Sequence, residues 1–342
     1  MLRLSVLDQS TVVTGRSPDT SIRESLALAK HCEALGYHRY WCAEHHNSES
    51  QAGTAPEILI SAIAATTSRI RVGSAGVMLP HYSSLKVAEQ FRVLEAIAPG
   101  RIDLGLGRAP GSDGRTAFAL NPLAETAADH FPAQVRDLLA WVSGQKLVEG
   151  HPFRDVMAQP GGPTVPELWI LGSSDYGAQV AAYFGLPFCF ASFITDGRAV
   201  EQALAIYREG FRPSQRWPAP YAGLCVWAMA ADTAEEAARL FRSREMWRLG
   251  RDRGVYSALP SPEEAESYPY SAAELQRVER LRARALYGTP DVVGAKLSEL
   301  AAVHGVEEIA ILTTLHDPQA RRRSYTLLAQ WLGLEGMVPL AG

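Results

Sequence analysis

Short apolar runs alternate with longer amphipathic segments along most of the chain. The run at 2–7 is followed by a stretch, 21–35, in which apolar residues recur every three or four positions before Gly36. The first pattern is typical of a buried strand and the second of a helix that packs on one side. Repeated in this order, the two patterns predict consecutive βα units around a parallel sheet.

The alternation continues along the chain and predicts eight strands. Strands are expected at 2–7, 37–43, 70–79, 101–107, 167–172, 187–192, 221–230 and 307–313. Helices are expected at 21–35, 56–67, 85–98, 127–142, 176–184, 197–211, 233–249, 272–287, 289–304 and 318–332. This order and length predict an α/β fold, a single (β/α)8 TIM barrel with insertions after strands four and seven. We expect one domain over residues 1–342, with the insertions at 109–132 and 250–287.

A doubly wound sheet would alternate in the same way. Its phosphate-binding fingerprint, G-x-G-x-x-G, has one partial match, at Gly105 and Gly107, where Pro110 stands in place of the third glycine. The third glycine allows close packing of helix on strand, and proline does not supply it. The barrel is therefore favoured.

Composition narrows the class of protein. The 342 residues are 47% hydrophobic and 20% charged, which excludes a disordered chain, a collagen-like repeat and a coiled coil. The net charge of -4 gives no reason to expect nucleic acid as a partner. Cys32, Cys42, Cys189 and Cys225 form no C-x-x-C pair and are expected to be buried, reduced thiols.

The distribution of apolar residues gives no indication of a membrane. No apolar stretch approaches the roughly 18 residues of a spanning helix. The run at 2–7 is too short for the apolar region of a secretion signal. We therefore expect a cytoplasmic protein with no membrane partner.

Candidate chemistry is sought where barrel strands end, because functional groups of such barrels gather at the C-terminal ends of the strands. The second strand runs into Glu44, His45 and His46. An imidazole at the mouth suits proton transfer near neutral pH, and spacing alone leaves a structural role equally open. A metal site is not expected, because adjacent residues of an extended segment point apart and the sequence places no third ligand.

Strands four and five end in small residues. Gly105 and Gly107 leave one face of strand four almost bare, which indicates either the close approach of a ligand or ordinary packing in a tapered barrel. Arg108, which follows, could meet an anion or lie in a salt bridge. Gly172, Ser173 and Ser174 come directly before a helix, where free backbone N–H groups favour a phosphate, although an ordinary helix cap has the same sequence. Together these segments indicate a planar, phosphorylated ligand across the barrel mouth.

At this point the sequence resembles the bacterial luciferase-like flavin monooxygenases. The resemblance covers nearly the whole chain, and its segments are 7–10 (LDQS), 43–46 (AEHH), 73–80 (GSAGVMLP), 99–108 (PGRIDLGLGR), 171–174 (LGSS), 184–187 (FGLP) and 288–290 (Gly-Thr-Pro). It implies a TIM barrel that binds reduced FMN, supplied by a separate flavin reductase, and that oxygenates a small organic substrate with O2 through a flavin C4a-peroxide. It also implies a homodimer, or a heterodimer of similar chains.

The resemblance further implies roles for individual residues. His45 matches the catalytic histidine of the family. Ala75 and Gly76 match a pair joined by a non-prolyl cis peptide against the flavin ring. Gly107 and Arg108 match positions beside the flavin, with the arginine toward its phosphate. Gly172, Ser173 and Ser174 match the phosphate-binding turn. Luciferase has a carboxylate and later a hydroxyl residue in this turn, where this chain has Ser173 and Gly177, so light emission is not implied.

Three other functions must be weighed against this one from the sequence. An oxidoreductase that uses the deazaflavin F420 shares the barrel and the Gly-Ser-Ser turn but transfers hydride without O2. A non-catalytic flavin-binding partner subunit would share the fold, and the presence of His45 speaks against it. A sugar-phosphate enzyme would need a glycine-rich phosphate loop after strands seven and eight, which the sequence does not offer.

The aromatic residues favour an apolar substrate. Tyr82, Phe118, Phe193 and Trp247 are expected around the pocket, and their side chains suit an apolar organic molecule. The identity of that molecule does not follow from the fold.

Overall fold

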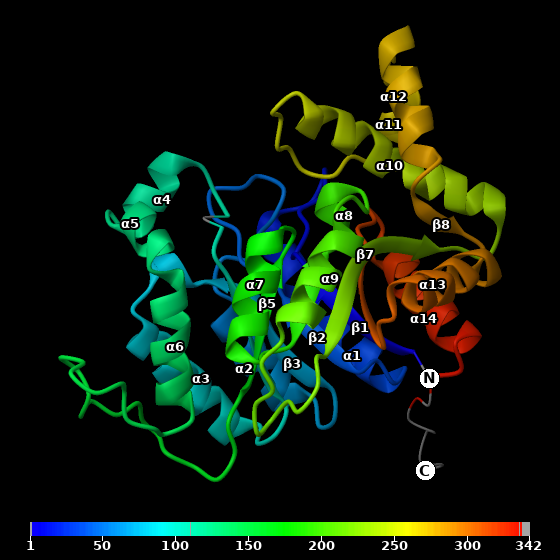
Figure 1. The fold of residues 1–342 in the computed structure, drawn as a ribbon. Helices are drawn as coiled ribbons and strands as arrows, with labels where there is room; N and C mark the ends of the chain where they lie inside the picture. Colours follow the sequence, from blue (N-terminus) through cyan, green and yellow to red (C-terminus); the bar gives the residue numbers. More distant parts are fainter. Residues whose placement is uncertain (1, 110, 335, 337–342) are drawn as a thin grey trace.

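The computed structural model describes residues 2–109, 111–334 and 336, so Pro110 lies outside the described residues. Its centre is a closed barrel of eight parallel strands, in the order β1-β2-β3-β4-β5-β6-β7-β9 (Figure 1). The strands are β1 (Arg3–Asp8), β2 (Arg39–Cys42), β3 (Arg71–Met78), β4 (Ile102–Gly107), β5 (Glu167–Gly172), β6 (Phe188–Ala191), β7 (Ala222–Ala230) and β9 (Glu308–Leu312). The predicted TIM barrel is confirmed.

Helices surround the barrel and bury the outward faces of its strands in one large apolar layer. They are α1 (Pro18–Ala34), α2 (Pro56–Thr66), α3 (Ser84–Ile97), α4 (Gly114–Leu120), α5 (Ala124–Asp129), α6 (Phe131–Val142), α7 (Asp175–Phe184), α8 (Ser192–Thr195), α9 (Val200–Gly210), α10 (Ala234–Asp252), α11 (Pro262–Ser267), α12 (Ala272–Arg282), α13 (Pro290–His304) and α14 (Pro318–Trp331), with a short 3-10 turn at Leu79–His81. Glycine and proline residues explain where several of these helices begin or end. For example, α7 and α13 stop at Gly185 and Gly305, whose positive φ angles of 61° and 57° suit glycine.

Two predicted helices are wrong in part. The helix expected at 127–142 is divided, because α5 ends at Asp129 and α6 starts anew at Phe131. Pro132 explains the division, since proline lacks the N–H that a continuous helix would need and is accepted in a first turn. The helix expected at 272–287 ends at Arg282, and β8 (Leu286–Gly288) follows as a ninth strand that pairs with the end of β7, outside the barrel.

Both predicted insertions are found near the C-terminal ends of the strands. Figure 1 shows α4 and α5 on one side of that end and α10, α11 and α12 on the other. The second insertion is fastened to the loop after β1, because Leu259 forms a β-bridge with Val13 and exchanges backbone hydrogen bonds with Val12 and Thr14. The insertions therefore frame the barrel mouth.

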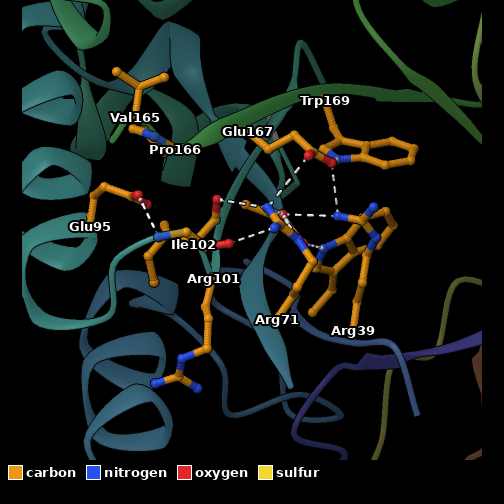
Figure 2. Close-up of polar contacts among 12 residues, drawn as sticks. Arg39, Arg71, Glu95, Arg101, Ile102, Val165, Pro166, Glu167 and Trp169 are labelled. Carbon is orange, nitrogen blue, oxygen red and sulfur yellow. Dashed lines mark hydrogen bonds and ion pairs between the residues drawn. The ribbon is translucent and has the colours of Figure 1, made fainter. Parts of the chain in front are cut away.

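A buried ionic layer fills the barrel at the N-terminal ends of its strands. Arg39 is 3% exposed and lies 2.9 Å from carboxylate oxygens of Asp103, Glu167 and Glu308. Arg71 also donates to Asp103, and Figure 2 shows Arg39 and Arg71 directed at Glu167. Each of these five residues comes from a different strand.

Aromatic side chains complete this layer. Trp41 and Trp169 donate their indole N–H groups to Asp103 and Glu167, each at 2.9 Å, and their rings meet edge to face. Burial alone would raise the pKa of Asp103, but Arg39 and Arg71 outweigh it and lower that pKa. Asp103 is therefore held ionised, and side chains fill the barrel at this end.

Two predictions from the sequence concern the cysteines and the absence of a membrane-spanning helix. All four cysteines are free and buried, as predicted. Among the helices of the described residues, none combines the length and apolarity that crossing a bilayer requires.

Removal of the central cation should destabilise the whole barrel. We expect Arg39→Met to lower the free energy of unfolding by about 3–5 kcal/mol, because three buried carboxylates lose a shared partner. Arg23→Met is the control, since Arg23 forms an exposed ion pair with Asp19, and such pairs contribute little to stability. Urea unfolding followed by circular dichroism measures both, and equal midpoints for the two variants would contradict the role of Arg39.

Candidate active site

A cavity of about 600 Å³ opens at the C-terminal ends of the barrel strands. All the candidate residues from the sequence line it, namely His45, Ala75, Gly76, Gly107, Arg108, Gly172, Ser173 and Ser174. The volume suits a cofactor or a drug-sized molecule. Both insertions contribute to the wall, through Ala109 and Phe131 on one side and Arg251 on the other.

His45 presents an unsatisfied ring to this cavity. Its backbone N–H donates to the carbonyl of Gly53 at 2.9 Å, which fixes the segment after β2. Its Nδ1 atom is buried and has no hydrogen-bond partner among the described residues. Burial lowers the pKa of His45 to about 4, and electrostatic interactions with Arg251 and His46 act in the same direction. The imidazole is therefore neutral at pH 7 and able to accept a proton.

Glu44 decides which histidine faces the cavity. Its carboxylate accepts hydrogen bonds from His46 Nε2 at 2.9 Å, from the Tyr82 hydroxyl at 2.7 Å and from the Met78 backbone N–H at 3.2 Å. His46 is thereby held outside the lining of the cavity, whereas His45 is part of it. The predicted pocket aromatics are right in part, because Phe193 and Trp247 line the cavity, whereas Tyr82 binds Glu44 and Phe118 is 65% exposed.

The glycines of β4 serve two different purposes. A Cβ on Gly105 would lie 2.1 Å from the carbonyl oxygen of Ser74, so this glycine is required by the backbone of β3. A Cβ on Gly107 would meet only the Val77 carbonyl oxygen at 3.9 Å, so this glycine leaves space in the cavity. Ordinary packing therefore explains Gly105, and space for a ligand explains Gly107.

The peptide bond between Ala75 and Gly76 on the neighbouring strand is cis, in agreement with the resemblance.

Arg108 and the start of α7 form a polar corner of the cavity. The Arg108 guanidinium lies 4.0 Å from the centre of the Tyr176 ring and forms no ion pair with a described residue. Ser174 is the N-cap of α7, and its side chain makes no capping hydrogen bond. The first amide N–H groups of the helix are therefore open to another acceptor, and an anion fits here.

Sequence reasoning missed a group of arginines on α10. Arg244, Arg248 and Arg251 line the cavity next to Trp247. Their spacing of four and three residues places them on one helix face. The predicted helix at 233–249 included Arg244 and Arg248 but ended before Arg251, and nothing in the sequence distinguished this helix face from one exposed to solvent. Among the described residues, no group of three His, Cys, Asp or Glu side chains is placed to hold a metal ion.

Comparison with known proteins places the chain in a family. The family model described as luciferase-like monooxygenase matches residues 2–307. A luciferase-like monooxygenase of Escherichia coli (strain K12) is 40% identical over 327 residues, covering 95% of this chain and 96% of that protein. The N-acetyl-S-alkylcysteine monooxygenase of Bacillus subtilis (strain 168) is 35% identical over 330 residues, covering 96% and 98% of the two chains.

Solved structures agree on the fold. The crystal structure of apo-MsnO8 has a TM-score of 0.89 and 37% identity, and the match covers 98% of this chain and 100% of that one. More distant likenesses, which bear on the fold alone, include a 3,6-diketocamphane monooxygenase component with FMN (TM-score 0.70, 18% identity, covering 99% of each chain). They also include an F420-dependent secondary alcohol dehydrogenase (TM-score 0.65, 13% identity, covering 98% and 99%).

The lowered pKa of His45 should depend on Arg251. We expect Arg251→Gln to move the pKa upward from about 4 toward the ordinary 6.5, because a cation that opposes protonation is removed. NMR titration of the His45 ring protons measures the shift. Arg242→Gln is the control, since Arg242 lies on the same helix but pairs with the exposed Glu266. A wild-type midpoint near 6.5 would contradict the desolvated site.

Proposed function

The chain belongs to the luciferase-like monooxygenase family, and from this premise we propose that it is a flavin-dependent monooxygenase that uses reduced FMN and O2 to oxygenate a small organic substrate. One observation carries the proposal: a neutral, unpartnered His45 and an anion-binding corner share a cavity with apolar walls. This is the combination that a phosphorylated redox cofactor and an apolar reactant would require.

The residues of the cavity fit FMN. Arg108, Ser173 and Ser174, with the open N–H groups of α7, would hold its phosphate. Ala75, Gly76 and Gly107 line the cavity and would face its ring system. The absent side chain of Gly107 leaves room for a flat group, whereas a Cβ on Gly76 would lie 2.8 Å from the carbonyl oxygen of Gly105. When bound, reduced FMN supplies the electrons that activate O2.

The role proposed for His45 is to hold and move one proton. A neutral imidazole accepts a proton from a reacting group and returns it later, and a pKa below neutrality keeps it ready to accept. The buried Nδ1 atom has no hydrogen-bond partner among the described residues, so no protein group would compete with a bound molecule that reached it. Trp41, Phe193 and Trp247 in the wall would exclude water from this reaction.

We further propose that a separate flavin reductase delivers the reduced FMN and that the protein works in the cytoplasm. The four unpaired, buried thiols suit a reducing compartment. An open cavity mouth between two insertions suits a cofactor that enters and leaves at each turnover.

A homodimer is proposed from the surface of two neighbouring helices. Ile58 on α2 is 66% exposed, and Val93 and Ile97 on α3 are 48% and 47% exposed. Apolar side chains gathered on adjacent helices mark an interaction surface. A second copy of the chain would cover them.

The cofactor and the reaction can be tested without a known substrate. The protein is loaded with FMNH2 under anaerobic conditions and mixed with air, and the absorbance of oxidised FMN is followed. We expect oxidised FMN to return more slowly than from free FMNH2, because the cavity excludes water and His45 controls the proton. His45→Gln should bind FMN with the wild-type affinity but lose this delay.

The matched control is His304→Gln at the far end of α13, which should behave as the wild type. If the wild-type protein returned oxidised FMN at the rate of the free cofactor, the F420-dependent enzyme or a non-catalytic flavin-binding chain would become the better assignment. Persistence of the delay in His45→Gln would remove the role given to His45.

The proposed dimer has its own measurement. We expect Ile58→Glu to convert a dimer into a monomer in light scattering, because a charge would be buried at the interface. Val303→Glu is the control, since Val303 is 69% exposed on α13, away from α2 and α3. An unchanged mass for Ile58→Glu would place the interface elsewhere.

A further inference from the structure

Arg244 is a buried cation without an anionic or carbonyl partner. Four arginines of the described residues are less than 9% exposed, and Arg244 is one of them, at 8%. Arg39 binds three carboxylates, Arg321 binds Asp8 and a carbonyl, and Arg92 binds backbone carbonyls. Arg244 has no hydrogen bond or ion pair to any described residue, only the face of Trp227, 4.2 Å from its guanidinium carbon.

The acids near Arg244 are already engaged. Asp196, whose charge acts on Arg244, binds Arg248 with both carboxylate oxygens at 3.2 Å. Of the two acids that line the cavity, Glu44 holds His46 and Asp252 pairs with Arg277. The α10 wall therefore carries uncompensated positive charge.

Two further observations agree with this excess of charge. Arg251 lies over the rings of Trp247 and Tyr256 and forms no ion pair with a described residue. Burial, together with Arg248 and Arg251, holds the pKa of Arg244 well below its usual range. An isolated buried charge is costly to a fold, so its presence indicates a ligand that supplies the opposite charge.

Arg244 belongs to a different part of the cavity from Arg108. Its partner ring, Trp227, is on β7 and donates to Thr314, which follows β9. In the closed ring of eight strands, β7 stands opposite β3, which carries Ala75 and Gly76, whereas Arg108 follows β4. A cofactor held at the Arg108 corner and over β3 would leave the α10 side of the cavity for a second molecule.

We propose that Arg244 binds the carboxylate of the substrate, which is then an organic acid with an apolar body. A planar guanidinium and a carboxylate fit each other through two parallel hydrogen bonds. Trp247, Phe193 and Leu312 offer apolar wall for the rest of the molecule. The assignment of this ligand as substrate rests on the proposed monooxygenase function, but the anion site itself does not.

Calorimetric titration of the full chain with octanoate and with octanamide tests the site, because the two probes differ only in charge and head group. We expect octanoate to bind about tenfold more tightly or better, with and without saturating FMN, because hydrogen bonds to a charged partner are worth that much. Arg244→Met should abolish the preference and leave the octanamide and FMN affinities unchanged. Arg244→Lys should retain part of the preference, because the charge remains.

Arg242→Met is the matched control, because it removes the same charge from the same helix outside the cavity and should keep the preference. The melting temperature of Arg244→Met should be at or above that of the wild type, because an unpaired buried charge is removed. Equal binding of the two probes by the wild type would overturn the proposal. So would weakened FMN binding in Arg244→Met, which would assign Arg244 to the cofactor, or a melting temperature several degrees lower, which would make it structural.

These binding measurements need neither O2 nor reduced flavin. If oxidised FMN returned without delay in the air-mixing experiment while the preference for octanoate held, the proposed oxygenation would fail and the anion site would stand. If the delay held and the preference did not, only the anion site would fail.

Discussion

The architecture depends on one buried constellation of charges, in which Arg39 and Arg71 neutralise carboxylates from three other strands. Because each of the five charged residues comes from a different strand, the charges can meet only when these five strands have the correct register. A slip of one residue would turn these side chains out into the apolar layer under the helices. The same register places Gly107 and His45 at the rim, so the closed end of the barrel determines the geometry of the open one.

The order of strands and helices was predictable because the strands are short apolar runs that are buried throughout, whereas the helices are longer and repeat their apolar residues every three or four positions. The points at which helices are interrupted were harder to predict. Pro132 lies inside one long helical pattern in the sequence, but in the structure it belongs to the first turn of a new helix. The ninth strand, at 286–288, could not be predicted. Its three residues pair with the part of β7 that extends beyond the barrel, which is a tertiary contact.

Candidate site residues could be predicted where they directly follow a barrel strand. They could not be distinguished from similar residues where contacts with other parts of the fold determine which one reaches the cavity. His45 and His46 are neighbours in sequence, and the hydrogen bond from His46 to Glu44 distinguishes their positions in the structure. Gly105 and Gly107 look alike, yet one touches the backbone of β3 and the other the cavity. The arginines of α10 could not be predicted as cavity residues, because an amphipathic pattern does not show that a polar helix face is directed toward a cavity and not toward solvent.

The closed ionic end also has an evolutionary consequence. Since the strands are locked at their starts by Arg39 and its partners, the segments that border the mouth contribute little to holding the barrel together. Substitutions, insertions and deletions in 109–132 and 250–287 can therefore accumulate with small effects on folding while they reshape the cavity. Such a division between a frame fixed by buried ion pairs and a permissive rim lets one scaffold acquire new substrate preferences through a few substitutions.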